Sequence, residues 1–381
     1  MKNKSVLIVI DHYLPSQKAG GPLRSVPNLV KNLSEIDFLI ITRDRDLGSK
    51  YPLSDIVVDQ WTKSFDANIF YASPSRFSII SLMRLINNSD CASIYLNSLF
   101  SFRATIIPLL LRLLNLTPKV KYVLAPRGEL SPGALSLKKI KKLVFLYISI
   151  SVGLYKDIVF HATSETEFID IKKYFPSNLC SDSLVYNPVS MPVPMSDVSN
   201  IADSRIFSIV FISRIVEKKN LHFLIELLND CSIDLRLNIY GPIEDSIYWK
   251  KCLNLIDCLP PNVAVIYGGD LGLDEVATKL SENDLFVFPT LGENFGHVIF
   301  ESLSVGTPVI VSSFTPWEKT TDGYIINALS LDSRIEWVNA IKKHAALTMN
   351  EKSQLRARAV NFASDFASNS FDSSAMYRLL S

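Results

Sequence analysis

The sequence predicts an α/β protein with two domains, each built on a parallel sheet, that face a central cleft. Short apolar runs alternate with segments of helical spacing along the chain, which is the pattern of strand–helix–strand units. A stretch without periodicity that contains three prolines, residues 186–204, divides these runs into two series. At 381 residues the chain is also too long for one ordinary core. We therefore assign residues 1–187 to the first domain, 188–204 to a linker and 205–365 to the second domain.

The apolar runs predict ten buried strands. Their apolar residues stand at successive positions, as in strands that helices cover on both faces of a parallel sheet. The runs are 6–10, 38–42, 93–97, 121–125 and 158–163 in the first domain, and 207–213, 235–241, 263–269, 284–290 and 308–313 in the second. Residues 221–230 and 274–283 have helical spacing. The last segment, 366–381, is also helical in pattern and could pack back on the first domain.

Composition and charge exclude several classes of protein. The net charge of +1 gives no global electrostatic reason to bind nucleic acid. The five cysteines are scattered, with no C-x-x-C pair, so we expect neither a disulfide framework nor a zinc site, and a reducing cytoplasm fits best. One of the longest apolar runs, 143–154, has 12 residues, against roughly 20 for a membrane span.

A glycine pair follows the first predicted strand. Gly20 and Gly21 allow the backbone to approach a ligand closely, and Pro22 suits the first turn of a helix whose free amides attract anions. Because Pro27 is awkward inside a helix, we expect the helix to begin later, with Ser25 as its N-cap. The alternative is a plain strand-to-helix loop.

Basic residues follow the first strand of the second domain. Arg214 stands at the carboxyl end of that strand, where ligands gather in open α/β sheets, and Lys218 and Lys219 come shortly after. An Arg and a Lys at this edge could neutralise a diphosphate. The alternative is a solvated cluster of loop charges.

Two glutamates flank a predicted helix start in "GENFGHVIFE". Gly296 and His297 are placed near that start, where amides can hold a phosphate. Glu293 lies in the preceding loop, whereas Glu301 interrupts an apolar helical pattern and must find donors if buried. Sugar hydroxyls are suitable donors for a carboxylate. The alternative for Glu301 is a partly exposed position on the flank of the helix.

Two further segments have charged patterns. Asp44 and Asp46 are spaced like a D-x-D metal motif, but we interpret them as a solvated loop. Lys138, Lys139, Lys141 and Lys142 precede the apolar run 143–154, so this segment could lie on anionic lipid. It could equally be a core helix with a basic, solvated start.

Several segments together resemble a known family. "SRIVEKKNL", "SENDLFVFPT" and "GENFGHVIFESLSVGTPVIVS" resemble the C-terminal domain of family 4 glycosyltransferases, and "GENFGHVIFE" matches their E-x7-E element. "AGGPLRS", "APRGELSPGALSLKKIKK", "FHATSETE" and "YNPV" resemble segments of bacterial members that act in surface polysaccharide assembly. The resemblance covers nearly the whole chain and implies the GT-B fold, in which two Rossmann-like domains face a cleft.

The resemblance also implies an activity. It implies a retaining, metal-independent transfer of a sugar from a UDP- or GDP-linked donor to a hydroxyl group of a saccharide, with no cofactor. The acceptor would be a growing, lipid-linked surface glycan (O-antigen, capsule or exopolysaccharide). Such an acceptor, together with the basic segment before residues 143–154, leads to the hypothesis that the enzyme attaches peripherally to the inner face of the plasma membrane. The alternatives are a nucleotide-sugar epimerase of the same fold and a non-catalytic protein that binds a nucleotide-sugar.

The donor site follows from the resemblance residue by residue. Arg214 and Lys219 would hold the diphosphate, Glu293 would bind hydroxyls of the donor sugar, and Glu301 would bind the ribose. The remaining donor-binding residues would be Gly20, Gly21, Asn294, Phe295, Gly296 and His297.

One segment departs from the family pattern. Many members carry a His after the strand that corresponds to residues 121–125, where this chain has Pro126-Arg127-Gly128. Arg127 and Glu129 are therefore candidates for the acceptor side. His161, at the end of the next predicted strand, is a third candidate, although a lone His is more often structural.

Overall fold

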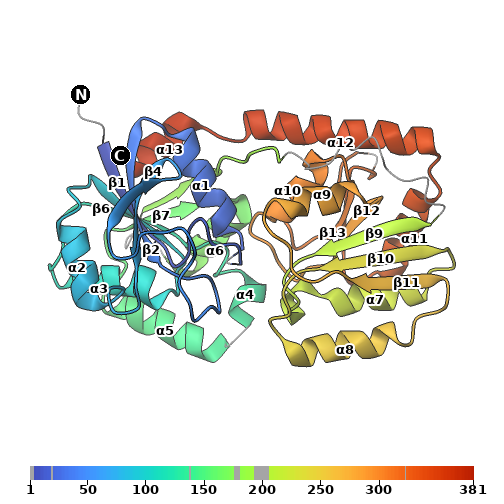
Figure 1. Ribbon diagram of the computed structural model, residues 1–381, viewed down its shortest axis with the longest axis horizontal. Coiled ribbons are helices and arrows are strands. Elements are labelled where there is room, and N and C mark those ends of the chain that lie inside the picture. Colours follow the sequence, from blue (N-terminus) through green and yellow to red (C-terminus); the bar gives the residue numbers. More distant parts are fainter. Residues whose placement is uncertain (1–3, 19, 137–138, 176–180, 193–205, 322) are drawn as a thin grey trace. The chain divides into compact units, whose positions relative to one another are not determined.

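The computed structural model describes residues 4–18, 20–136, 139–175, 181–192, 206–321 and 323–381. The chain forms two compact units, one of residues 1–189 and 369–381 and the other of residues 190–368 (Figure 1). Most of the predicted linker, residues 193–204, lies outside the described part of the chain.

The first unit is built on an eight-stranded sheet. All neighbouring strands are parallel except β3, which runs antiparallel to β4 at the edge of the sheet. In spatial order the strands are β3 (Trp61–Ser64), β4 (Ala67–Ala72), β2 (Ile36–Arg43), β1 (Lys4–Val9), β5 (Ser93–Asn97), β6 (Lys121–Ala125), β7 (Val159–Ala162) and β8 (Ser181–Leu184).

Helices cover both faces of this sheet. Successive residues of a strand point to opposite faces, so Val6 and Ile8 of β1 pack in one core and Leu7 and Val9 in another. The first core is covered by α1 (Pro22–Asn32) and α13 (Ser373–Leu380). The second core receives side chains from α2 (Ile79–Asn87), α3 (Ile107–Leu113), α4 (Pro132–Ser136), α5 (Lys139–Ser151) and α6 (Glu165–Tyr174).

The C-terminal helix α13 belongs to the first unit. Its residues Met376, Leu379 and Leu380 are buried in the core shared with α1. Lys121 Nζ donates a hydrogen bond of 2.9 Å to the carbonyl oxygen of Arg378. The chain therefore returns to its first sheet after completing the second unit.

The second unit contains a six-stranded, wholly parallel sheet. In spatial order its strands are β11 (Val263–Tyr267), β10 (Leu235–Tyr240), β9 (Phe207–Ile212), β12 (Leu285–Phe288), β13 (Val309–Ser312) and β14 (Ile326–Leu329). Figure 1 shows α7 (Leu221–Asn229) and α8 (Ser246–Ile256) on one face of the sheet. The other face carries α9 (Glu275–Ser281), α10 (His297–Ser304) and α12 (Met349–Asn369), and α11 (Arg334–Ala345) contacts α7.

Two expectations about the elements are corrected. Each of the ten predicted strands is present, but β3, β4, β8 and β14 escaped prediction. Helix α1 begins at Pro22 and has Pro27 inside it, so Ser25 is not its N-cap. Burial favours the earlier start, because Leu23 and Val26 lie three positions apart on one helix face and both are buried.

Candidate active site

The loops that follow β9 and β12 meet at the carboxyl edge of the second sheet. These two strands are neighbours, and Asn220 Nδ2 donates to the carbonyl oxygen of Pro289 over 2.9 Å. The amide of Leu291 donates to the carbonyl oxygen of Lys218 over 2.8 Å. Asn220 itself has a φ of 59°, a left-handed conformation that Asn tolerates better than most residues. The two loops therefore hold each other in place through backbone and amide contacts.

Lys219 and Glu293 are joined by these loops. Lys219 closes a short 3-10 turn, and its Nζ donates to Oε1 of Glu293 as an ion pair. Their side chains are only 11% and 15% exposed, and the ammonium lies 5.3 Å from the centre of the Phe288 ring. Low exposure strengthens the attraction between the charges because less water screens them.

Arg214 lies two residues after β9 but takes a different partner. Its NH1 nitrogen contacts both carboxylate oxygens of Glu244, at 3.3 and 3.1 Å. The two side chains are 44% and 31% exposed. The structure thus brings Lys219 and Glu293 together, while Arg214 is held at the surface by a carboxylate that the sequence analysis did not single out.

Helix α10 begins at His297, as predicted, and Gly296 precedes it with a φ of 78°. A Cβ atom at Gly296 would lie 2.8 Å from Cδ1 of Ile299, so the turn favours glycine in both conformation and space. The amides of Phe295 and Gly296 donate to no atom within the described part of the chain. Trp317 Nε1 donates to the carbonyl oxygen of Phe295 over 2.5 Å and so helps to fix this loop.

Glu301 stands on α10, about one turn beyond its start. The residue is 9% exposed and has apolar neighbours in the sequence, Phe300 and Ile299, that are fully buried. The alternative of an exposed position on the helix flank therefore does not describe it. Phe300 packs near Trp317 and Phe366, so this part of α10 is covered by aromatic side chains.

In the first unit, the loop of the glycine pair is held by the segment that resembled a metal motif. Gly20 has a φ of 72°, and the amides of Gln17 and Lys18 donate to the carboxylate of Asp46 at 2.9 and 3.3 Å. Asp44 is only 3% exposed and is paired with the Arg45 guanidinium at 2.8 Å. The interpretation of this segment as a solvated loop was wrong, because one acid is buried and the other organises a neighbouring loop.

Arg127 and His161 lie in one hydrogen-bonded chain at the carboxyl ends of β5, β6 and β7. Arg127 Nε and NH2 both donate to Oδ1 of Asn97, at 2.9 and 2.7 Å, and NH2 also donates to the Tyr95 hydroxyl at 3.0 Å. The hydroxyl oxygen lies 2.8 Å from Nδ1 of His161, and His161 Nε2 lies 2.8 Å from the carbonyl oxygen of Val185.

The two ends of this chain fix the direction of its protons. Arg127 can only donate and a carbonyl can only accept, so Tyr95 donates to Nδ1 and the ring of His161 carries its proton on Nε2. Burial, and next to it the nearby Arg127 charge, lowers the pKa of His161 to about 3. His161 is fully buried, and both its nitrogens are bonded within the protein. It therefore holds the Tyr95 hydroxyl that contacts Arg127, and it offers no free ring nitrogen.

Glu129 is committed to the loop after β5. Its carboxylate accepts from the Ser98 hydroxyl at 2.8 Å and from the amides of Leu99 and Phe100 at 2.6 and 3.0 Å. Burial raises the pKa of the Glu129 carboxyl, and these hydrogen bonds oppose that effect.

Sequence reasoning missed Tyr95 and Asn97, although a polar residue that ends an apolar run at the carboxyl edge was a usable signal.

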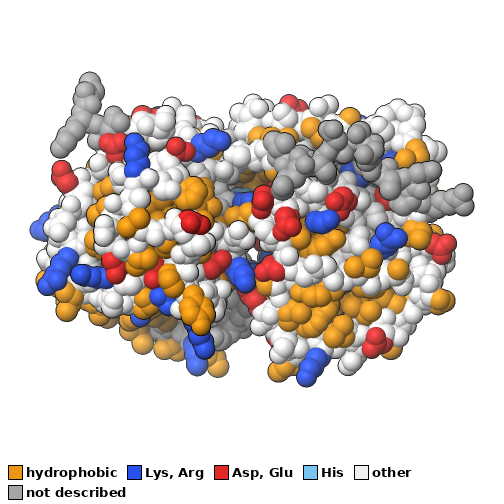
Figure 2. Space-filling view, in the orientation of Figure 1, with side chains coloured by type: hydrophobic (Ala, Val, Ile, Leu, Met, Phe, Trp, Pro, Cys, Tyr) orange, Lys and Arg blue, Asp and Glu red, His pale blue; other side chains and the backbone are white. Residues whose placement is uncertain are grey.

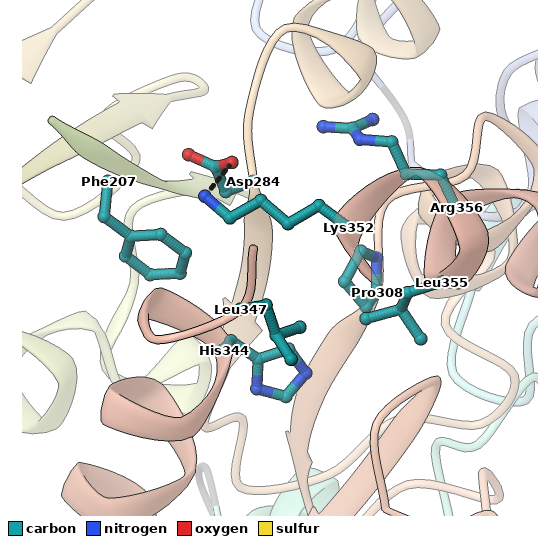
Figure 3. Close-up of a pocket in the computed structure, with 8 residues that line it drawn as sticks. All are labelled: Phe207, Asp284, Pro308, His344, Leu347, Lys352, Leu355 and Arg356. Carbon is teal, nitrogen blue, oxygen red and sulfur yellow. Dashed lines mark hydrogen bonds and ion pairs between the residues drawn. The ribbon is translucent and has the colours of Figure 1, made fainter. Parts of the chain in front are cut away.

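A small cavity lies at the opposite, amino-terminal end of the second sheet. Figure 3 shows Phe207, Asp284 and Pro308, which precede or open strands of the sheet, facing Lys352 and Arg356 of α12. Lys352 is paired with Asp284 at 3.0 Å. Burial lowers the pKa of the Arg356 guanidinium, which donates to the carbonyl oxygens of Ser281 and Asn283. These contacts fasten α12 to the sheet, far from the loops of the carboxyl edge.

The described residues contain neither a metal-binding cluster nor a membrane-spanning helix. No cluster of three or more His, Cys, Asp or Glu side chains in this part of the chain has an arrangement able to hold a metal ion. Nor does any helix of this part combine the length and the apolar character that crossing a membrane demands.

Comparisons with known proteins agree with this architecture. Residues 197–361 match the family model described as "Glycosyl transferases group 1". A 41.2 kDa protein in the cps region of Klebsiella pneumoniae is 22% identical over 375 residues, which are 94% of either chain.

Among solved structures, Anabaena HepE in complex with UDP-glucose superposes with a TM-score of 0.70 at 17% identity over 98% of both chains. Sucrose-phosphate synthase from Thermosynechococcus elongatus gives a TM-score of 0.72 at 15% identity, over 99% of this chain and 98% of that one.

Proposed function

We propose that this chain is a glycosyltransferase that transfers a sugar from a nucleoside-diphosphate sugar to a hydroxyl group of a growing, lipid-linked surface glycan. The GT-B fold and the match of residues 197–361 to the group 1 family model support this proposal. The donor carries uridine or guanosine diphosphate, and the reaction retains the configuration of the transferred sugar without a metal ion. The observation that carries the proposal is the joining of Lys219 and Glu293 beside the two free amides that precede α10.

The donor site is assembled from these groups. The ammonium of Lys219 and the amides of Phe295 and Gly296 neutralise the diphosphate, because a helix start with free amides attracts anions. The carboxylate of Glu293 accepts hydrogen bonds from hydroxyls of the donor sugar, and Glu301 accepts them from the ribose. Arg214 reaches the diphosphate after leaving Glu244, and its exposed pair makes that exchange inexpensive in free energy.

Further donor contacts come from neighbouring residues. The backbone of Asn294 and the side chain of His297 face the sugar and the phosphate. In the first unit, Gly20 and Gly21 carry no side chain, so their backbone can approach a phosphate closely. The positive φ of Gly20 also favours glycine at that position. Asp46 positions that loop through two of its amides.

The proposed chemical step is attack on the same face from which the leaving group departs. The bond between the anomeric carbon and the diphosphate oxygen breaks, the acceptor oxygen forms the new bond, and the proton of the acceptor hydroxyl passes to the departing diphosphate. Lys219, Arg214 and the helix-start amides stabilise the charge that develops on the diphosphate. Glu293 stays bound to the sugar hydroxyls and orients the reacting carbon.

Two of the similar proteins support the proposed donor and product. HepE binds UDP-glucose, which favours uridine diphosphate among the donor classes. The relative from the cps region of Klebsiella pneumoniae supports a surface polysaccharide as the product.

The surface of α5 supports peripheral attachment to the inner face of the plasma membrane. Six apolar side chains stand exposed at helical spacing on and just after this helix: Ile140, Leu143, Val144, Tyr147, Ile148 and Val152. Figure 2 shows hydrophobic side chains gathered along the lower edge of the first unit, where Figure 1 places α5. Lys139 and Lys141 are exposed at the start of the helix. Exposed apolar residues beside lysines are typical of a helix that lies on anionic lipid.

Thermal stabilisation by donors tests the proposal. UDP-, GDP- and ADP-sugars are each added to the wild-type protein and to Lys219→Gln and Lys279→Gln variants. Because bound ligand stabilises by mass action, a donor at about 100 times its Kd adds about 2.7 kcal/mol. We expect a UDP- or GDP-sugar to raise the Tm of the wild type and of Lys279→Gln, whose exposed pair with Glu282 lies elsewhere, and to leave Lys219→Gln unchanged.

Mass spectrometry of the products then distinguishes the activities. Transfer lengthens an acceptor glycan and releases the nucleoside diphosphate, whereas epimerisation leaves the nucleotide-sugar intact. A protein that no nucleotide-sugar stabilises, or one that only isomerises its donor, would contradict the proposal.

A further inference from the structure

Arg127 is held in a costly arrangement that its own neighbours do not explain. Its φ is 58°, a left-handed backbone conformation that is uncommon for a residue with a side chain, and Gly128 follows with a φ of 74°. Such conformations persist where the surrounding structure fixes them, and they cluster at binding sites. The side chain is half-buried, so it has given up part of its hydration.

The guanidinium is fixed by neutral groups alone. Asn97 accepts two of its hydrogen bonds and Tyr95 accepts a third, and its central carbon lies 5.9 Å from the centre of the Tyr95 ring. Within the described part of the chain, no carboxylate lies within ion-pair distance of Arg127. A half-buried cation without a counterion is unfavourable unless something else supplies the negative charge.

Two carboxylates that contact the loops around Arg127 are engaged elsewhere. Glu129 accepts from the Ser98 hydroxyl and two amides, as described above. Glu167 accepts from the amide of Gly128 at 2.6 Å and from the amide and hydroxyl of Thr163 at 2.8 and 2.7 Å. Both carboxylates therefore shape the loops around Arg127 and do not bind its guanidinium.

This cluster has more donors than acceptors. The NH1 group of Arg127 has no partner among the described residues, and it is not sealed from solvent. The Nδ2 amide of Asn97 is buried and also lacks a partner in this part of the protein. The neutral ring of His161 closes the far end of the chain, because its proton is already bonded to Val185. Only an incoming acceptor can use the free guanidinium edge.

We propose that Arg127 is the centre of an oxyanion-binding site at the carboxyl edge of the first sheet, which takes a phosphate or carboxylate group carried by the acceptor. The planar guanidinium presents its donors in a fixed fork that matches either group. Asn97 and Tyr95 act as positioning residues that fix the fork before the ligand arrives, which lowers the entropy lost on binding. The assignment of the anion to the acceptor rests on the proposed function; the site itself does not.

Calorimetric titration of the full-length protein at constant ionic strength tests the site. Inorganic phosphate and glucuronate are the two probes, and the proteins are the wild type, Arg127→Gln, Arg76→Gln and Lys219→Gln. Arg76 is an exposed arginine of the same unit and controls for loss of one positive charge. We expect at least one probe to bind the wild type, Arg76→Gln and Lys219→Gln. Its affinity should fall about tenfold to a hundredfold in Arg127→Gln, as for a lost hydrogen bond between charged groups.

The two probes separate the sources of the anion. Binding of phosphate alone points to a phosphate-bearing acceptor, and binding of glucuronate points to an acidic sugar; either supports the site if Arg127→Gln removes it. Failure of both probes to bind the wild type overturns the proposal. So does binding that Lys219→Gln removes and Arg127→Gln leaves intact, because the anion would then lie at the donor site.

Arg127→Lys keeps the charge but loses the fork, and it serves if Arg127→Gln does not fold. We expect an intermediate loss of affinity in this variant. Unchanged affinity would contradict the claim that the planar guanidinium, and not the charge alone, binds the anion. Titration of the same proteins with a UDP-sugar reports on the donor site separately. A protein that binds no nucleotide-sugar but still binds phosphate through Arg127 would refute the proposed function and keep this site.

Discussion

Lys219 donates a hydrogen bond to Glu293 although the two residues stand 74 positions apart in the chain. They come from the loops after β9 and β12, neighbouring strands whose sequence order is not consecutive. The ammonium and the carboxylate neutralise each other, and their side chains are only 11% and 15% exposed. If the proposed function holds, a donor that binds here exchanges one set of charge contacts for another, and both side chains are already in position for it.

Loss of Glu293 should affect stability as well as activity. Glu293→Ala leaves the Lys219 ammonium largely buried without its carboxylate, and breaking such a pair costs about 3 kcal/mol. Glu293→Gln keeps an acceptor oxygen and should cost less. Chemical denaturation measures both effects. Glu282→Gln, which breaks the exposed pair with Lys279, is the control and should change the free energy of unfolding by about 0–1 kcal/mol.

The same variants separate stability from catalysis. We expect the transfer rate of Glu293→Ala to fall about a hundredfold or more at a temperature where the protein is folded, as for the loss of one polar group that orients the reacting centre. Turnover at the wild-type rate would contradict the role given to Glu293.

Much of the fold could be predicted from the sequence because buried parallel strands are continuous apolar runs. All ten such runs form strands, from β1 to β13. Two of the four missed strands are of another kind: β3 alternates exposed residues, and β8 is the polar segment Ser181–Leu184 at the edge of the sheet. In contrast, β4 is a buried and largely apolar run that the sequence analysis missed. Edge strands bury few side chains, so their sequences carry little of the apolar signal. Helix α1 shows the converse, since burial of Leu23 prevailed over the local preference of Pro27.

Only part of the candidate site could be predicted from the sequence. The helix start at Gly296 and His297 followed from a glycine after an apolar run, which is a local signal. The partners were not legible, because they depend on which loops meet in space. The spacing of residues in the sequence predicts neither the ion pair of Lys219 with Glu293 nor that of Arg214 with Glu244. Likewise, the roles of Asn97 and Tyr95 depend on Arg127, which lies two residues after the neighbouring strand β6.

Glu244 should act as a mild competitor of the donor. It holds Arg214 in an exposed ion pair, which contributes about 0–1 kcal/mol to stability. Glu244→Gln therefore should leave the free energy of unfolding within about 0.5 kcal/mol of the wild type. It should also bind UDP as tightly as the wild type or several-fold more tightly, because Arg214 is released. Calorimetry with UDP checks this, and a marked loss of affinity would show that Glu244 itself belongs to the donor site.

Glu301 should be sensitive to the hydroxyls of the ribose. Replacement by Gln removes a charged acceptor, so UDP affinity should fall about tenfold or more. The matched control is a ligand and not a second variant. Binding of 2′,3′-dideoxy-UDP, which lacks both hydroxyls, should be weak and nearly equal in the wild type and in Glu301→Gln. Equal losses for the two ligands would mean that Glu301 acts on the fold of α10 and not on the ribose.

The exposed face of α5 should determine membrane binding. Ile140, Tyr147 and Ile148 are 79%, 75% and 55% exposed, so their joint replacement by Ser removes apolar area without disturbing the core. Co-sedimentation with vesicles that contain phosphatidylglycerol should then fall about tenfold or more. Ile247→Ser with Ile335→Ser is the control, because these side chains are 82% and 74% exposed in the second unit.

The lysines of the same helix should add a salt-dependent part. Lys139→Glu with Lys141→Glu should weaken binding to anionic vesicles more at low salt than at high salt, since each lysine near such a surface contributes about 1 kcal/mol. Lys142 is left unchanged because its Nζ donates to the carbonyl oxygen of Ala134 at 2.6 Å and lies over the Phe100 ring. Binding that neither set of replacements reduces would exclude α5 as the attachment surface.

The buried His161 should make stability fall in mild acid. Its pKa is lowered to about 3 in the folded protein, chiefly by burial, whereas in the unfolded chain the group has its ordinary value of 6.5. Between these values the unfolded state binds a proton that the folded state refuses, so stability is lost as the pH falls from 6.5 toward 3. The slope reaches about 1.4 kcal/mol per pH unit. Glu129 acts in the opposite direction, because its raised pKa lets the folded protein take up a proton first.

Denaturation of the wild type and of His161→Gln between pH 4 and pH 7 isolates this contribution. The variant loses stability at pH 7, because Tyr95 and the carbonyl of Val185 lose well-placed partners. Its stability should nevertheless fall less steeply as the pH decreases, so that the two curves converge toward pH 4. Parallel curves would show that His161 takes up its proton in the folded protein near its ordinary pKa. The chain of hydrogen bonds that holds Arg127 would then run with its protons in another order.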